Sequence, residues 1–308
     1  MNKVKGVIFA VISAISFGVS PILIAITYQM GNNSMMMAFV RNILVLPFLF
    51  FYIKMRRIPM KISKEQLKQL TLMTVFGTCL SLTVLYISYN YIPVSLATSI
   101  HFIYPSIVAV LSVIVFKEYM SPLRKLAVAC SLFGILLFID FKSGSSNLFL
   151  GIGLALISGI AYSFYLVYMA KSDVLKIESI VVLYYSCLIS SIFLGSLTIF
   201  TGNLVITGIR VEGWLLILLI SIMIAFLGTM FTQLAILNIG ATTTSVLATL
   251  EPISTIVLGV VLFDEKMGIA KLIACILILL AVLLLGIDQK TMAKRRAKHI
   301  EKYEDIVY

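Results

Sequence analysis

The sequence contains one stretch twice, as IPVSLATSIHFIYPSIVAVLSVIVFKEYM at residues 92–120 and as IGATTTSVLATLEPISTIVLGVVLFDEKM at residues 239–267. Matches of Ile, Leu and Val carry little information in a chain that is 61% hydrophobic, but proline and acidic residues are scarce. Pro105 and Glu118 are separated by the same interval as Pro252 and Glu265. The shared interval indicates an internal duplication.

Small residues near the start of each copy also repeat. Residues spaced by four lie on one face of a helix, and small ones there let another helix approach closely in lipid. Close packing is our first interpretation of Gly18, Ala14 and Gly159, and a surface on which helices slide during transport is the second. The two ridges are Gly6, Ala10, Ala14 and Gly18 in the first copy and Gly151, Ala155, Gly159 and Ser163 in the second.

Composition places the chain in a lipid bilayer. Its mean hydropathy is +1.09 and only 12% of its residues are charged, which would leave a soluble protein with an insoluble surface. A helix needs about 20 apolar residues to cross the hydrocarbon core. The segments that satisfy this criterion, with loose edges, are 4–26, 35–53, 67–89, 94–116, 123–139, 148–170, 179–200, 213–236, 241–263 and 268–287.

Each copy contains five such segments, and five is an odd number. A duplicated unit with an odd number of crossings must insert its second copy in the opposite direction, which is a recurrent construction of secondary transporters. We therefore predict an all-α integral membrane protein with ten transmembrane helices in two inverted five-helix repeats. The repeats are residues 1–142 and 143–288, and residues 289–308 form a polar tail.

The distribution of positive charge predicts the orientation. With the N-terminus inside, most of the 24 Lys and Arg residues fall on the cytoplasmic side. Only Lys142, Arg210, Lys266 and Lys271 fall outside, and Arg41 lies within a span. The positive-inside rule then predicts a protein of the cell membrane with both termini in the cytoplasm. The basic part of the tail is expected to lie against anionic lipid, and nucleic acid is not an expected partner.

Three ionisable side chains besides Tyr and Cys lie well inside predicted spans: Arg41, His101 and Glu251. A charge at the centre of a span costs about 2.5–3.5 kcal/mol on insertion scales, so these groups are expected to face the bundle interior or water. We expect Glu251 near the midplane, where transporter sites usually lie. It is a candidate for binding a substrate ammonium or for exchanging protons. The alternative is a protonated carboxyl group that bonds a neighbouring helix.

His101 and Arg41 have similar pairs of interpretations. A histidine titrates near neutral pH, so His101 suits gating or proton coupling, or else it is a satisfied interior side chain. Arg41 has the donors to bind a substrate carboxylate or phosphate, or else it is a structural partner of Glu251 or of carbonyl groups at helix ends. An Arg and a Glu in one cavity would fit a zwitterion such as an amino acid. Further polar candidates for substrate binding are Tyr162, Tyr86, Gln233 and Asn90.

The repeated proline and glutamate have structural interpretations. Pro105 and Pro252 are expected to kink their helices and to free backbone carbonyls. Glu118 and Glu265 stand where one span ends and the next begins, so a carboxylate there can cap the free amides of the next helix.

The order and spacing of these motifs resemble the drug/metabolite transporter superfamily, and most closely its EamA-type ten-helix branch. The resemblance covers residues from about 4 to 287 and implies alternating access around a central substrate cavity between the halves. It does not imply a substrate, because members handle very different metabolites. The motifs are Phe17-Gly-Val-Ser-Pro21, Phe39-Val-Arg41, His101-Phe-Ile-Tyr-Pro105, Phe116-Lys-Glu118, Leu250-Glu-Pro252 and Phe263-Asp-Glu265.

Other classes of protein are less consistent with the sequence. A membrane enzyme would need clustered acids and histidines or a nucleophile with its base, and the chain has 2 His and no recognisable triad. No Walker motif is present, so no ATP, metal or other cofactor is expected. A sensor or scaffold would not require polar residues at mid-membrane. The expected partners are a small-molecule substrate and membrane lipid, and a homodimer is compatible with a pathway complete in one chain.

Overall fold

The computed structural model describes residues 3–116, 120–137, 146–232, 234–235, 238–239, 247–248, 250–263, 268–270, 272–284 and 286–288. Within these ranges the chain is helical, and no strand occurs. The predicted all-α class is therefore confirmed. The tail and the residues Glu118, Gln233 and Glu265 lie outside the described residues.

The first copy begins with two long helices and a third, composite one. The third segment is continuous from residue 64 to residue 88 but contains a π-helical stretch, η1, in its middle. The fourth segment is broken at Phe102 and Ile103. The elements are α1 Lys3–Gln29, α2 Ser34–Met55, α3 Lys64–Met73, η1 Thr74–Cys79, α4 Leu80–Ser88, α5 Val94–His101, α6 Tyr104–Phe116 and α7 Pro122–Leu136.

The second copy follows the same plan. Its third segment also contains a π-helical stretch, η3, and its fourth segment contains α12, which begins at Leu250. A last apolar helix spans Leu272–Asp288. The remaining elements are α8 Ser146–Lys171, the 3-10 turn η2 Asp173–Lys176, α9 Ser179–Phe200, α10 Val211–Ile222, η3 Met223–Met230 and α12 Leu250–Phe263.

Seven helices of the described chain are long and apolar enough to cross a membrane. They match the predicted spans that begin near residues 4, 35, 67, 94, 148, 179 and 213. The helices Pro122–Leu136, Leu250–Phe263 and Leu272–Asp288 are shorter than such a span. The structure is thus that of a multi-pass membrane protein.

Local sequence signals explain where several helices begin. Asn33 accepts a hydrogen bond from the backbone N–H of Met36 (2.8 Å), which caps α2. Ser63 and Gln66 form a capping box at the start of α3. In this motif two backbone donors that a helix leaves unpaired are satisfied by side chains. Gly31, with a φ of 95°, allows the tight turn between α1 and α2.

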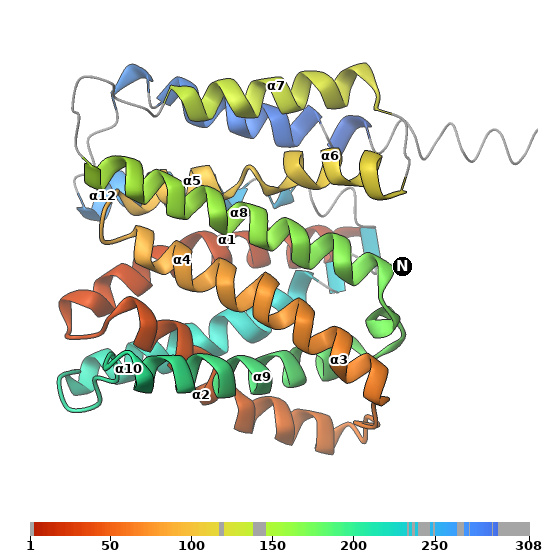
Figure 1. Cartoon of the computed structure of the whole chain (residues 1–308), viewed down its shortest axis with the longest axis vertical. Coiled ribbons are helices and arrows are strands. Elements are labelled where there is room, and N and C mark those ends of the chain that lie inside the picture. Colours follow the sequence, from red (N-terminus) through yellow and green to blue (C-terminus); the bar gives the residue numbers. More distant parts are fainter. Residues whose placement is uncertain are drawn as a thin grey trace, which may run out of the picture.

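The first helix of each copy packs against the third and fourth segments of the other copy. Helix α1 contacts α12, η3 and α10, whereas α8 contacts α5, α6, η1 and α4. In Figure 1, α1 runs from the marked N-terminus at the right to the left, and α8 runs in the opposite direction. Helices α2 and α9 pack together on one side of this centre. On the other side α7 packs against the helix Leu272–Asp288, whose Ala274 carbonyl oxygen lies beside Gly134.

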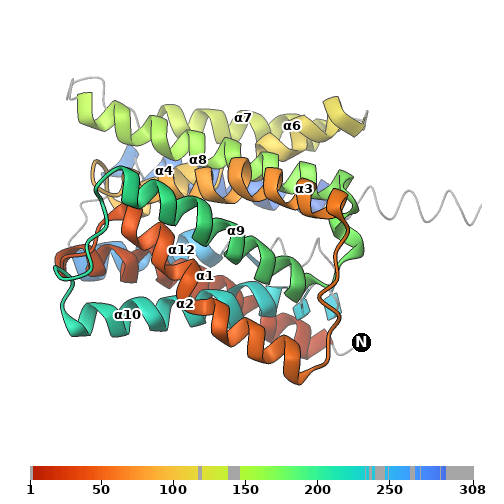
Figure 2. The same cartoon turned by 60° about the horizontal axis from the view of Figure 1, so that its bottom comes forward.

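The two ends of the bundle differ in charge. We call one the basic end: it holds the start of α1, the loop 56–63 and η2, and it lies at the right of Figures 1 and 2. Gln66 and Gln69 bond the backbone of Asp173 across it. The described loops at the opposite end contribute Arg210. The basic end carries Lys5, Lys54, Arg56, Arg57, Lys61, Lys64, Lys68 and Lys176.

Candidate functional site

The fourth segment of each copy is interrupted just before its proline. Helix α5 ends at His101 and α6 starts at Tyr104, so Pro105 lies in the first turn of α6. In the second copy α12 starts at Leu250 and Pro252 lies in its first turn. A proline in a first turn loses no helical hydrogen bond, because the N–H groups there have no partner within the helix. At the place where Pro105 was expected to kink the fourth segment of the first copy, the helix is interrupted at Phe102 and Ile103.

The break places Glu251 in the first turn of α12, where the positive end of the helix favours a carboxylate. Glu251 is half-buried. Among the described residues none forms a hydrogen bond or ion pair with its carboxylate. The carboxylate is close enough to three tyrosines, Tyr89, Tyr104 and Tyr162, to interact with them electrostatically. In the described part of the chain it is therefore an acid that interacts electrostatically with three phenol groups and has no cationic partner.

The imidazole of His101 lies against two of these tyrosines. Its Nδ1 atom is 2.8 Å from the Ser158 hydroxyl on α8, and its ring centroid is 5.5 Å from that of Tyr104 and 5.6 Å from that of Tyr162. The Tyr104 and Tyr162 rings meet nearly edge to face, with centroids 4.8 Å apart. His101, Tyr162 and Glu251 thus belong to one cluster, and Tyr162 contacts a candidate site residue directly.

Arg41 is held by Tyr86 and not by Glu251. Its guanidinium donates a hydrogen bond to the Tyr86 hydroxyl and lies 5.9 Å from the centroid of the same ring. The described residues contain no ion pair between Arg41 and Glu251. Tyr86 in turn packs against Tyr89, with ring centroids 5.9 Å apart. Arg41 thus contacts Tyr86, Tyr86 contacts Tyr89, and Tyr89 interacts electrostatically with Glu251.

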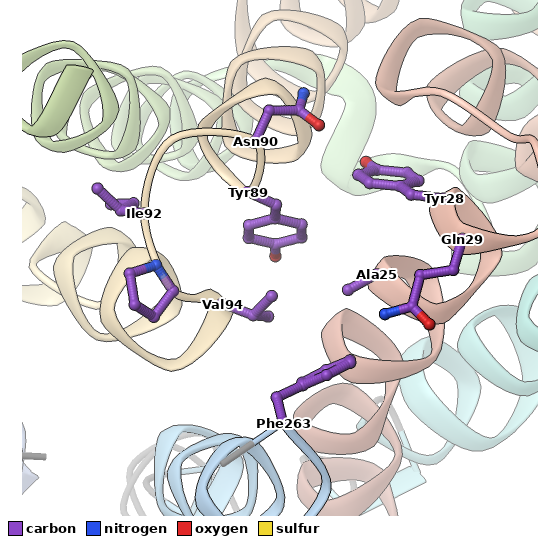
Figure 3. Close-up of a pocket in the computed structure, with 9 residues that line it drawn as sticks. Ala25, Tyr28, Gln29, Tyr89, Asn90, Ile92, Val94 and Phe263 are labelled. Carbon is purple, nitrogen blue, oxygen red and sulfur yellow. The ribbon is translucent and has the colours of Figure 1, made fainter. Parts of the chain in front are cut away.

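A cavity of about 300 Å³ opens at the end of the bundle opposite the basic end. We call it the vestibule. Figure 3 shows Tyr89 projecting into it, with Tyr28 and Gln29 of α1 on one side and Phe263, the last residue of α12, on another. The Tyr89 hydroxyl is buried and lies near that of Thr98, yet the two are outside hydrogen-bond geometry. The vestibule is lined by Ala25, Tyr28, Gln29, Tyr89, Asn90, Ile92, Pro93, Val94 and Phe263.

Tyr89 connects the vestibule with the interior, because it lines the cavity and also contacts Tyr86 and neighbours Glu251. The candidate Asn90 lies in the vestibule wall, where it donates a hydrogen bond to the Ser34 hydroxyl (2.8 Å). The importance of Tyr28, Tyr89 and Ser158 was not predicted. Tyrosine and serine are common in apolar spans, so nothing in their spacing separates these residues from packing.

The predicted small-residue ridges lie in the closest helix contacts. A Cβ atom on Gly18 would come 2.5 Å from the Glu251 carbonyl oxygen, and one on Gly159 would come 3.0 Å from the His101 carbonyl oxygen. Ala14, one helical turn before Gly18 on α1, is buried as well. The ridges therefore position the backbones that carry Glu251 and His101, in agreement with close packing.

The described residues contain no group of three or more His, Cys, Asp or Glu side chains that could hold a metal ion. Their four cysteines are free thiols. The chemistry available at the centre is thus that of a carboxylate, a guanidinium, an imidazole and several phenols, which suits recognition of a polar solute.

Comparison with known proteins agrees with this arrangement. The EamA-like transporter family matches residues 4–139 and again residues 149–287. The chain is 36% identical over 95 residues to a Synechocystis protein named "Uncharacterized transporter sll1319", and the match covers 30% of this chain and 29% of that protein. The chain thus matches less than a third of that relative's length. A crystal structure of a protein shares its fold, with a TM-score of 0.62 at 15% identity, over 92% of this chain and 98% of the other. The chain therefore belongs to the EamA-like transporter family.

Proposed function

We propose that the protein is a secondary transporter that moves a small organic solute, amino-acid-like or otherwise polar, across the cell membrane by alternating access. The observation that carries the proposal is the convergence of Glu251, His101 and Tyr162 at the breaks of the fourth segments. Interrupted helices near the middle of a bundle are where transporters of inverted-repeat construction bind their substrates. Arg41 and Tyr86 complete the proposed site on its other side.

Two equivalent interfaces support the proposal of alternating access. In the proposed architecture residues 1–142 and 143–288 are inverted repeats of five spans each, ten in all. The first helix of each repeat packs against the fourth segment of the other repeat. The same set of contacts therefore occurs twice, between helices that run in opposite directions. Rocking of the two repeats about this centre would open the vestibule in one state and the basic end in the other.

Glu251 is the proposed coupling group, because a carboxylate can carry either a proton or a cationic substrate. The titratable groups around it in the described chain are Tyr89, Tyr104 and Tyr162, with His101 behind the last two. Glu251→Gln removes the titration and keeps the size of the side chain. We expect this variant to show no uptake at any pH tested, and uptake with the pH profile of the wild type would remove the proton role.

Both termini are proposed to lie in the cytoplasm, because the basic end then obeys the positive-inside rule. The tail 289–308 is proposed to rest on anionic lipid. Single cysteines at Lys61 and Asn203, in a chain whose four cysteines are replaced by serine, test the orientation in intact cells. A membrane-impermeant maleimide should label the Asn203 position and not the Lys61 position. The reverse pattern would overturn the proposed topology.

Reconstitution of the purified full-length chain in liposomes tests transport itself. Uptake should be screened over amino acids, amines and nucleosides, with and without an imposed pH gradient. Saturable uptake of at least one class is expected. Folded protein that moves none of them would contradict the proposal. The molar mass of the detergent-solubilised chain would show whether a homodimer forms, which the proposal does not require.

A further inference from the structure

We infer that Glu251 and the tyrosines around it bind the cationic nitrogen of an organic amine or quaternary ammonium substrate. The inference rests on the proposed function and names the substrate class of the same site. It concerns the end of the solute that carries positive charge, and it requires no carboxylate on that solute.

The balance of charge at the centre favours a cation. The Glu251 carboxylate has no cationic partner in the described part of the chain, whereas Arg41 is already engaged by the hydroxyl and the ring of Tyr86. The other buried acid of this part, Asp288, is paired with Arg124 at 2.7 Å. A carboxylate in lipid without a partner is costly, so a cationic ligand is the natural complement of Glu251.

The rings near the carboxylate suit a cation of low hydration. Tyr104 and Tyr162 meet at 4.8 Å, and Tyr162 stacks on Tyr165 at 5.6 Å, so the two tyrosines that interact electrostatically with Glu251 belong to an array of aromatic faces and edges. Aromatic faces attract alkylated ammonium groups through their quadrupoles, and the attraction is stronger when the site excludes water. A small hydrated metal ion would gain little from these rings.

The vestibule is consistent with the passage of such a cation. Among the described residues its lining contains three aromatic rings, those of Tyr28, Tyr89 and Phe263, and no charged side chain (Figure 3). Gln29 adds an exposed amide that can accept a hydrogen bond. A cation entering here would meet no positive charge from the described part of the chain before it reaches Tyr89, which interacts electrostatically with Glu251.

Thermal unfolding of the purified full-length chain tests the inference with matched probes. Choline and its uncharged carbon isostere 3,3-dimethylbutan-1-ol have the same shape and differ in charge, and methylammonium, tetraethylammonium and benzyltrimethylammonium extend the size series. At least one cation should raise the Tm in a saturable manner, and the neutral isostere should not. No shift with any cation, or an equal shift with the isostere, would overturn the inference.

Variants assign the binding to the proposed residues. Glu251→Gln should abolish the shift, and Glu212→Gln, at the start of α10, should retain it. Tyr162→Phe keeps the ring and should bind as the wild type does, whereas Tyr162→Leu should bind about tenfold more weakly, the loss expected for one cation–π contact. A full shift in folded Glu251→Gln protein would contradict the assignment.

A measurement on the wild type covers the case in which Glu251→Gln does not fold. A hydrophobic carbodiimide should modify Glu251, and the cation that raises the Tm should protect it, as mapped by mass spectrometry. Modification unaffected by that cation would overturn the inference. Flux in liposomes separates the two proposals. Uptake of another solute class without cation binding refutes the inference alone, and cation binding without any flux refutes the transport proposal alone.

Discussion

The contact of α1 with the fourth segment of the second copy and the contact of α8 with that of the first copy are built alike. Gly6 lies against Ile239, and its counterpart Gly151 lies against Ile92, the counterpart of Ile239. The Gly18 backbone lies against the Glu251 carbonyl group, and the Ser163 hydroxyl donates to the Tyr104 carbonyl oxygen (3.2 Å). The shared contacts form the scaffold.

The side chains attached to this scaffold differ. The counterpart of Glu251 is Tyr104, and that of His101 is Ala248. Ser158 bonds Ser81 and also lies 2.8 Å from His101, whereas its counterpart Ser13 bonds Gly228 and Thr232. The two copies therefore share their helix packing, whereas the carboxylate of Glu251 and the imidazole of His101 each occur in one copy alone.

The largest expected effect comes from filling the closest contact. Gly18→Leu would place a side chain where a Cβ atom already meets the Glu251 carbonyl oxygen at 2.5 Å and the Ser254 Cβ atom at 2.7 Å. Backbone atoms cannot rotate away, so we expect no recoverable monodisperse protein in size-exclusion chromatography. The matched control is Gly153→Leu, because nothing lies within 4 Å of a Cβ atom at Gly153. Equal yields of the two variants would contradict the scaffold.

The second effect concerns the contact between α7 and the helix Leu272–Asp288. Asp288 accepts a bond from Arg124 at 2.7 Å, and both side chains are buried. Asp288→Leu should lower the free energy of unfolding by about 3–5 kcal/mol, because it leaves a buried guanidinium without its carboxylate. Denaturant titration measures the loss. The double variant Arg124→Met with Asp288→Leu should regain much of it, and a double variant no more stable than the single one would argue against the pair.

The third prediction compares equivalent serines. Ser13→Ala and Ser158→Ala each remove buried interhelical hydrogen bonds, so both should cost about 1 kcal/mol of stability. Only Ser158→Ala releases the imidazole of His101, so only this variant should also change the rate or the pH profile of uptake. Equal effects of the two variants on uptake would show that His101 needs no positioning by Ser158.

The smallest effect is expected at Ser163. Ser163→Ala removes the bond to the Tyr104 carbonyl oxygen and keeps the Cβ atom, so the cost should be about 0.6 kcal/mol, the average for a hydrogen bond between membrane helices. Differential scanning measurements should detect at most a small fall in Tm, and uptake should remain. A loss of folded protein comparable to that expected for Gly18→Leu would mean that the Ser163 side chain is essential to the helix contact.

Much of the scaffold could be predicted from the sequence, because hydropathy, small residues spaced by four and a repeated proline are local signals. The position of the break at Phe102 and Ile103 and the π-helical stretches η1 and η3 could not, since they depend on neighbours. Gly77 of η1 lies against Tyr165, and Gly228 of η3 lies against Phe17. For the site, the buried charges Arg41, His101 and Glu251 were identifiable by their cost in lipid. Their tyrosine neighbours were not, because the partner of Arg41 and the surroundings of Glu251 arise only when distant segments meet.

Uptake by proteoliposomes containing Glu251→Gln or Tyr104→Phe tests most directly whether the residues that differ between the two copies bind the substrate. These residues occupy equivalent positions in the two copies, and both substitutions preserve the size of the side chain. We predict that Glu251→Gln abolishes uptake of the wild-type substrate while the protein remains folded, and that Tyr104→Phe, which keeps its ring, continues to transport. Wild-type uptake by Glu251→Gln would contradict the account.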